Sequence, residues 1–174
     1  MAAILAIVAS KFVCRSTRAA LRAAVFSMSR LTKPLLFASP EECEQAFYDA
    51  LEAADGEAVA ELLLEDDDVV CVHPGGPRLT GHAAVRESWS AILKGGPVNV
   101  RANLVKALET PTVALHNVVE EVVISAGGKQ QIVNVVATNA YVKTAAGWKM
   151  ILHHASATPD GAPSIDSAGH GVLH

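Results

Sequence analysis

Residues 130–156, QQIVNVVATNAYVKTAAGWKMILHHAS, consist of two strand-like segments joined by a short link. The segments, residues 130–144 and 148–156, are rich in Val, Ile and aromatic side chains, which favour strands. The link at residues 145–147 contains a glycine and is short enough for a hairpin. We therefore predict that these two strands pair in the antiparallel direction.

Two more strand-like segments precede this hairpin, at residues 98–108 and 112–125. Residues 109–111 link them to each other, and residues 126–128 link the second one to the hairpin. Both links are short and contain Pro or Gly, which are typical of turns. Together the four segments predict an antiparallel meander.

A helix is predicted just after Ser39, because three independent signals for a helix start coincide there. The Ser39 side chain can cap the helix, Pro40 suits its first position, and Glu42 stands three residues after the cap. Apolar residues then recur at spacings of three and four as far as Ala54. The helix is therefore expected to bury one face.

Two further helices are predicted at residues 57–64 and 82–93, with a short strand at residues 69–73 between them. The Pro-Gly-Gly-Pro cluster at residues 74–77 ends that strand. Helices followed by a meander predict an α+β domain, with three N-terminal helices packed against one face of a bent antiparallel sheet. We place this domain at residues 39–156.

The two ends of the chain differ from the domain in composition. Residues 1–38 contain six basic residues and no acidic residue, which is typical of a mitochondrial transit peptide. Alternatively, translation begins at Met28 and the leader is a dispensable or disordered extension. Residues 157–174 are rich in Gly, Pro, Ala and Ser and are predicted to be disordered. We expect a cytoplasmic protein, or a mitochondrial one if the leader is a transit peptide.

Charge and cysteine content exclude several classes of protein. From Glu41 onward, eight basic residues stand against 18 acidic ones, so this part of the chain would repel a nucleic acid. The apolar residues 1–10 are half as many as the roughly 20 that a membrane-spanning helix needs. Cys14, Cys43 and Cys71 are far apart and odd in number, which predicts neither a disulfide framework nor a structural zinc site and favours a reducing compartment.

Strand periodicity predicts which polar side chains share a face, because alternate residues of a strand point to the same side. His116 and Glu120 fall on one face, and burying an unpaired Glu120 carboxylate would be costly unless it lies where the strand emerges into solvent. Asn139 falls on the apolar face of its strand. In the last strand, the same parity groups His154 with the apolar side chains and turns His153 the other way.

No metal site and no cofactor are predicted from these residues. Because His153 and His154 are neighbours on a strand, they cannot both reach one ion. A site formed by His73, His116, Glu120 and one of His153 or His154, from different strands, stays geometrically possible, but no metal-binding spacing supports it. The glycines near residue 75 lack the features of a phosphate-binding loop.

Residues 46–89, AFYDALEAADGEAVAELLLEDDDVVCVHPGGPRLTGHAAVRESW, and residues 135–156 resemble the SnoaL-like and ketosteroid-isomerase-like proteins of the nuclear transport factor 2-like superfamily. The resemblance implies a cone formed by a strongly bent sheet wrapped by three helices, with a pocket inside. Members of this superfamily commonly dimerise through the sheet. They include isomerases, dehydratases and hydrolases, and also proteins without catalytic activity, so fold alone does not assign a reaction.

The resemblance also implies roles for individual residues. His73 stands where the steroid isomerases keep an Asp general base, and Asn139 falls near their second oxyanion donor. Phe47 matches their donor Tyr, and Tyr48 is adjacent to it. Loss of the phenol hydroxyl at Phe47 argues against steroid isomerisation, while His73 could still move a proton near neutral pH. Glu120 is a candidate auxiliary catalytic group.

We therefore expect a small apolar ligand in a pocket lined by Phe47, Trp89, His116 and His154. Its chemistry would be cofactor-independent acid/base catalysis of the isomerase, dehydratase or hydrolase type, in a homodimer. The alternative is a non-catalytic module that binds a ligand or only dimerises. Side chains of His73 and Asn139 that converge on one cavity would favour the enzyme.

Overall fold

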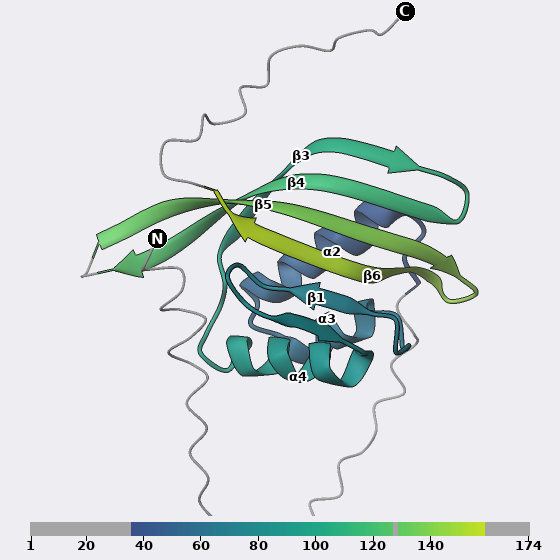
Figure 1. The fold of residues 1–174 in the computed structure, drawn as a ribbon, viewed down its shortest axis with the longest axis horizontal. Coiled ribbons are helices and arrows are strands. Elements are labelled where there is room, and N and C mark those ends of the chain that lie inside the picture. Colours follow the sequence, from purple (N-terminus) through teal and green to yellow (C-terminus); the bar gives the residue numbers. More distant parts are fainter. Residues whose placement is uncertain (1–35, 127–128, 159–174) are drawn as a thin grey trace, which may run out of the picture.

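The computed structural model describes residues 36–126 and 129–158, which form three helices on one face of a six-stranded sheet (Figure 1). The elements in chain order are α2 (Pro40–Glu52), α3 (Gly56–Leu62), β1 (Val70–Val72), β2 (Arg78–Thr80), α4 (His82–Leu93), β3 (Val100–Glu109), β4 (Val113–Ala126), β5 (Lys129–Thr144) and β6 (Gly147–Ala157). This architecture confirms the α+β prediction. None of the described helices has the length and apolar character needed to cross a membrane.

The first helix begins where the sequence predicts. The Ser39 hydroxyl accepts a hydrogen bond from the Glu42 amide at 3.2 Å, and Pro40 occupies the first turn. Such a cap satisfies one of the amides that a helix start leaves without a partner. The buried side chains Cys43 and Phe47 belong to the face that packs against the sheet.

The sheet has the strand order β2-β1-β6-β5-β4-β3. Strands β3 to β6 form the predicted antiparallel meander, whereas β1 pairs with β6 in the parallel direction. The sheet is therefore mixed. In Figure 1, β4 and β5 extend beyond the helices, and the helices cover the other end of the sheet.

Strand β2 was not predicted from the sequence. Residues 74–77 turn the chain back on itself, so that Val72 pairs with Arg78 and Val70 with Thr80. Only afterwards does the chain enter α4. A strand of only three residues is too short to show an alternating pattern of apolar and polar side chains, so β2 cannot be recognised from the sequence without its pairing to β1.

The folded part begins before residue 39. Phe37 is buried in the core and forms a bridge with Gly147, although the prediction assigned it to the leader. A Cβ atom at Gly147 would lie 2.7 Å from the Phe37 carbonyl oxygen, and this glycine has a positive φ of 89°. Gly147 therefore permits the close approach of the two segments. The rest of the predicted leader and tail, residues 1–35 and 159–174, lies outside the described residues.

A bulge in β6 corrects the predicted orientation of its histidines. Tyr141 pairs with Met150 but Ala140 pairs with Leu152, so Ile151 is an extra residue in β6. An extra residue reverses the alternation of side chains beyond it. As a result His153 is buried and His154 is exposed, which is the opposite of the prediction.

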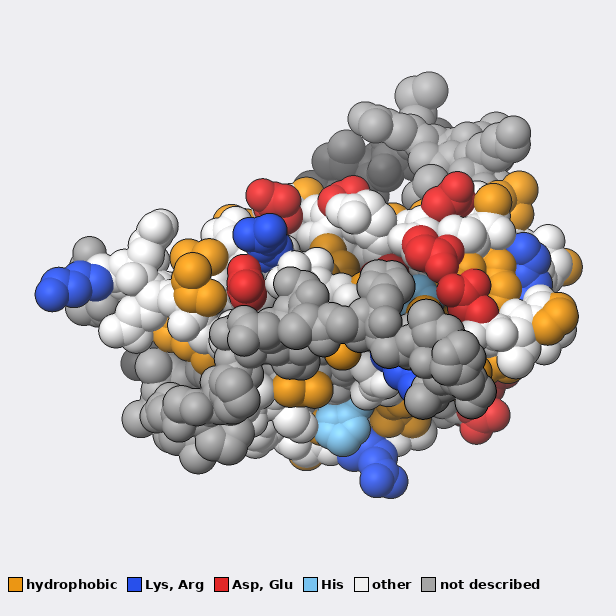
Figure 2. Space-filling view, turned by 90° about the horizontal axis from the view of Figure 1, so that it is seen from above, with side chains coloured by type: hydrophobic (Ala, Val, Ile, Leu, Met, Phe, Trp, Pro, Cys, Tyr) orange, Lys and Arg blue, Asp and Glu red, His pale blue; other side chains and the backbone are white. Residues whose placement is uncertain are grey.

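The surface of the described residues agrees with the acidic composition of the domain. Figure 2 shows acidic side chains gathered on the face seen from above, with hydrophobic side chains between them. Cys43 and Cys71 are buried and free, and Cys14 lies outside the described residues.

Candidate functional site

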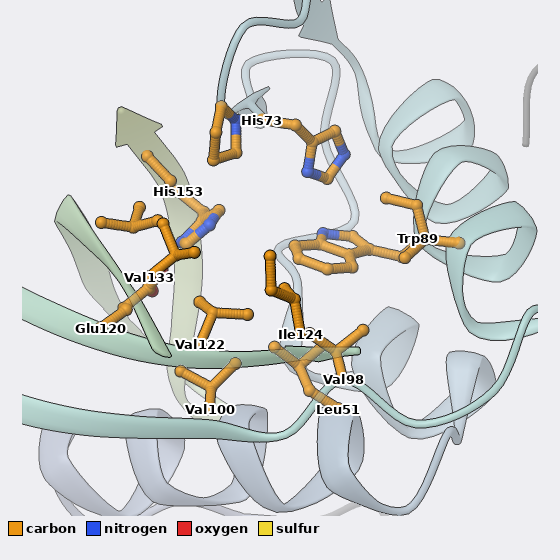
Figure 3. Close-up of a pocket in the computed structure, with 14 residues that line it drawn as sticks. Leu51, His73, Trp89, Val98, Val100, Glu120, Val122, Ile124, Val133 and His153 are labelled. Atoms are coloured by element: carbon orange, nitrogen blue, oxygen red, sulfur yellow. The ribbon is translucent and has the colours of Figure 1, made fainter. Parts of the chain in front are cut away.

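A cavity of about 110 Å³ lies between the sheet, α4 and the turn after β1 (Figure 3). One water molecule needs roughly 10–15 Å³ on the same measure, so the cavity has room for a small organic molecule. Most of its wall is apolar, with Leu51, Ile92, Val98, Val100, Val122, Ile124, Val133, Val135 and Ala155. Only four residues of the described lining carry a polar side-chain group: Glu120, His73, His153 and Trp89.

Glu120 supplies the only carboxyl group of the described cavity lining. It lies on β4 with 6% of its surface exposed, and its Oε1 accepts a hydrogen bond from the Tyr48 hydroxyl at 2.8 Å. Burial raises the pKa of the Glu120 carboxyl to about 7, although the Tyr48 hydrogen bond acts in the opposite direction. Glu120 therefore exists in both protonated and ionised forms near neutral pH.

His153 is held in one orientation by Asn139. The Asn139 amide nitrogen donates to Glu44 at 2.9 Å and to the Tyr48 hydroxyl at 3.1 Å, which leaves its Oδ1 as an acceptor. His153 Nδ1 lies 2.8 Å from this oxygen and donates to it. Burial lowers the pKa of His153 to about 3. The ring is therefore neutral, and its Nε2 carries a lone pair.

His73 follows β1 and reaches the cavity from the side opposite the long strands (Figure 3). Its Nε2 lies 2.9 Å from the Ser88 hydroxyl, and its ring meets Trp89 edge-on at 4.7 Å between centroids. Burial lowers the pKa of His73 to about 4. The residue expected to act as the base is therefore neutral at pH 7 and a weaker base than a solvated histidine.

Glu44 joins several of the buried polar groups and was missed by the sequence prediction. On α2, its carboxylate accepts hydrogen bonds from Asn139, from His116 Nδ1 at 3.0 Å and from the Tyr141 hydroxyl at 2.9 Å. On an amphipathic helix, a glutamate usually faces solvent, so its identity alone gives no warning. One feature of the sequence could have indicated its burial: Glu44 lies one helical turn before Tyr48, on the same face of the helix.

The structure places the predicted site residues in two groups. Glu120, His73 and Trp89 line the cavity. Asn139 lies behind it and is linked to the lining directly through His153 and, by way of Tyr48, to Glu120. His116 is buried beside Glu44 and does not line the cavity.

Two predicted pocket residues lie elsewhere. Phe47 is fully buried and packs against the rings of Trp89 and His153, so it supports the cavity wall without lining it. His154 is exposed, and its predicted place in the lining is taken by His153.

A protein-family model for the SnoaL-like domain matches residues 41–160, most of the chain. The chain belongs to the SnoaL-like family. The match includes every helix of the fold and every strand, and it confirms the resemblance seen in the sequence. A search of curated proteins finds no match.

Two solved structures are similar in both sequence and fold. One, from Thiobacillus denitrificans, is a candidate association domain of calcium/calmodulin-dependent protein kinase type II. It is 32% identical, with a TM-score of 0.66, over 72% of this chain and 99% of the other. The second, from Streptomyces avermitilis, is a candidate dehydratase of the nuclear transport factor 2-like family. It is 30% identical, with a TM-score of 0.60, over 67% of this chain and 91% of the other.

A ketosteroid isomerase-like protein from Erwinia carotovora atroseptica shares the fold at 19% identity. Its TM-score is 0.58, over 68% of this chain and 94% of the other. These relatives differ in the roles their names give them. The family membership therefore establishes the fold and leaves the role to be inferred from the site.

Proposed function

We propose that this protein binds a small, largely apolar molecule with a carbonyl or hydroxyl group in the cavity, and that Glu120 moves a proton on it. The observation that carries the proposal is a buried carboxyl group whose pKa is raised to about 7, in the wall of an apolar cavity. General acid/base catalysis is most efficient when the pKa of the catalytic group lies near the working pH.

The other polar groups of the lining suit the orientation of a ligand oxygen. His153 Nε2 can accept a hydrogen bond from a ligand hydroxyl, because Asn139 holds the proton on Nδ1. Trp89 contributes its ring to the cavity wall, while its indole N–H is buried. A few placed polar groups in an apolar cavity are typical of small-molecule sites.

Glu120 takes the role that the sequence suggested for His73. A neutral His73 with a lowered pKa holds a proton poorly at pH 7, whereas Glu120 exchanges one readily. In this proposal His73 and His153 act as neutral hydrogen-bonding groups, and Asn139 positions His153. The reaction class is a cofactor-independent isomerisation or elimination, and the similarity to the candidate dehydratase supports the elimination.

The test begins with a thermal-shift screen of small ketones and hydroxyketones. Each ligand found is then assayed by NMR for exchange of hydrogen for deuterium at the carbon next to its carbonyl. We expect Glu120→Gln to lower the exchange rate about 100-fold or more, since general acid/base groups contribute that much. Glu121→Gln is the control, because this neighbour points to the other face of β4. Ligands that bind the wild type without any exchange between pH 6 and pH 8 would contradict the catalytic part.

A second candidate function, assembly through the sheet, rests on a different observation. The face of β3, β4 and β5 away from the helices exposes Leu108, Val113, Val123, Ile132 and Val136. A row of exposed apolar side chains favours an interface with another protein chain. We propose a second copy of this chain, which the similarity to the candidate association domain supports.

Sedimentation equilibrium tests this candidate. Ile132→Lys and Val136→Lys are expected to shift the protein to monomer, while Leu104→Lys, which changes an exposed leucine on the other face, leaves the assembly intact. A monomeric wild type would rule out the dimer.

A further inference from the structure

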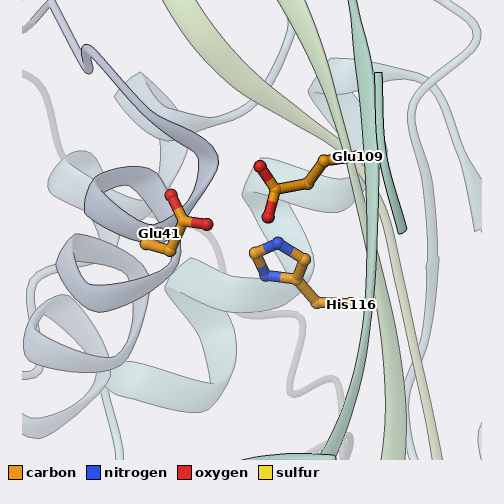
Figure 4. Close-up of side chains that lie close together, drawn as sticks. All are labelled: Glu41, Glu109 and His116. Atoms are coloured by element: carbon orange, nitrogen blue, oxygen red, sulfur yellow. The ribbon is translucent and has the colours of Figure 1, made fainter. Parts of the chain in front are cut away.

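Glu41, Glu109 and His116 form a second cluster, outside the cavity lining (Figure 4). Glu41 lies in the first turn of α2, Glu109 ends β3, and His116 lies on β4 opposite the last part of β3. One carboxylate oxygen of each glutamate and one ring nitrogen of the histidine lie within 4.8 Å of one another.

The buried nitrogen of His116 points to a missing partner. The ring is fully buried, and its Nε2 has no hydrogen-bond partner among the described residues. Its other nitrogen, Nδ1, lies 3.0 Å from a Glu44 carboxylate oxygen, which can only accept. In the neutral ring the proton is therefore on Nδ1, and Nε2 carries the lone pair. Figure 4 shows a ring nitrogen of His116 turned toward the Glu109 carboxylate, with Glu41 beside it.

A doubly protonated His116 is the alternative without a ligand. Its Nε2 would then carry a proton and donate to Glu41 or Glu109. No such hydrogen bond is present, although the side chains of both glutamates are exposed. The arrangement fits a lone pair better than a donor.

The charges around the ring also call for a cation. Three carboxylates, those of Glu41, Glu44 and Glu109, surround one imidazole. Within the described part of the chain, neither Lys nor Arg forms an ion pair with any of them. A divalent cation between Nε2 and the two exposed carboxylates would balance this charge.

We propose that Glu41, Glu109 and His116 bind a divalent transition-metal ion of the Zn²⁺ type. One imidazole and two carboxylates suit zinc, whereas Mg²⁺ and Ca²⁺ prefer oxygen ligands alone. Glu44 accepts the hydrogen bond from His116 Nδ1, as second-shell carboxylates do for metal-bound histidines.

The geometry requires a small adjustment of the ligands. Tetrahedral Zn²⁺ with bonds of about 2.0 Å places its ligand atoms about 3.3 Å apart, so the cluster must close slightly. His116 is fixed in the sheet, but the side chains of Glu41 and Glu109 are exposed and can rotate toward it. A fourth position is left for water or another ligand.

The experiment is a competition titration of Zn²⁺ between the full chain and a chromophoric chelator at pH 7. We expect one Zn²⁺ per chain that Glu109→Gln weakens about 100-fold, because losing a second-shell partner alone costs 10- to 100-fold. Glu52→Gln is the matched control, since it removes the same charge from an exposed position on α2. Equal binding by all three proteins, or no binding by the wild type, would overturn the proposal.

An NMR readout keeps the proposal testable without any variant. On addition of Zn²⁺ we expect the ¹⁵N signal of His116 Nε2 to shift while Nδ1 keeps its proton. A ring that is protonated on both nitrogens at pH 7 and unaffected by Zn²⁺ would overturn it. Neither result depends on Glu120, so the proposed acid/base function is tested separately.

Discussion

His153 and His116 lie on the same inner face of the sheet, yet their surroundings give them different chemistry. Each has its Nδ1 beside an acceptor, Asn139 Oδ1 for His153 and a Glu44 oxygen for His116. The free nitrogen of His153 faces an apolar cavity, whereas that of His116 faces two carboxylates. A histidine thus offers an oriented lone pair, and its surroundings decide whether a small molecule or a cation is the suitable partner.

Asn139 joins these two regions, so its replacement is expected to have the largest effect. Asn139→Leu leaves Glu44, Tyr48 and His153 each without a buried hydrogen bond. At about 1–3 kcal/mol for each unsatisfied group, we expect the free energy of unfolding to fall by about 4 kcal/mol. Urea unfolding measures it, with Asn134→Leu on the opposite face of β5 as control. Equal losses in both variants would contradict the proposed network.

The cavity histidines make the protein sensitive to acid. His73 has a pKa lowered from 6.5 to about 4, so below pH 6.5 the unfolded chain takes up the proton first. Its stabilising contribution is complete above pH 6.5 and is lost as the pH falls to 4. We expect the stability of the wild type relative to His73→Gln to fall by about 3 kcal/mol over this range. His154→Gln, at an exposed position, should show no such change. If the free energies of unfolding of the wild type and of His73→Gln depend on pH in the same way, the prediction is wrong.

Glu120 responds to pH in the opposite direction. Its pKa is raised from 4.5 to about 7, so its contribution is complete below pH 4.5 and is lost as the pH rises to 7. The wild type should therefore lose about 2 to 3 kcal/mol relative to Glu120→Gln between these values. Unfolding curves at several pH values measure the difference, with Glu121→Gln as control. A constant difference would mean that Glu120 titrates as in water and is a poor candidate for the catalytic group.

The smallest effect is expected at the carboxylate cluster when no metal is added. Glu109 is exposed, so Glu109→Gln should change the urea midpoint little. With Zn²⁺ present, the wild type should gain more stability than Glu109→Gln, since a ligand stabilises the folded state that binds it more tightly to a greater extent. A large loss of stability without metal would assign Glu109 a structural role.

The sequence predicted the elements whose periodicity is long enough to read. The first helix, the four long strands, and the shared face of His116 and Glu120 all followed from spacing and turn residues. Strand β2 and the β6 bulge did not, because a three-residue strand and one inserted residue depend on what the neighbouring strands offer.

The chemistry of the site was harder to predict than its position. Glu120 and His73 were among the predicted candidates. Which of them can exchange a proton near neutral pH depends on how deeply each is buried, and a local sequence pattern does not give the degree of burial. Glu44 was missed because its three donors come from two strands far away in the sequence. Long-range pairing decides these contacts.

Ile151, as the one extra residue of β6, decides which face of the sheet each later residue of this strand occupies. Every side chain after it changes sides, which exchanges His154 for His153 and brings Ala155 to the inner face. Deletion of this single residue would present the neighbouring histidine to the cavity without altering either histidine. One residue in β6 thus sets which histidine faces the cavity, while the sequence of the histidine pair stays the same.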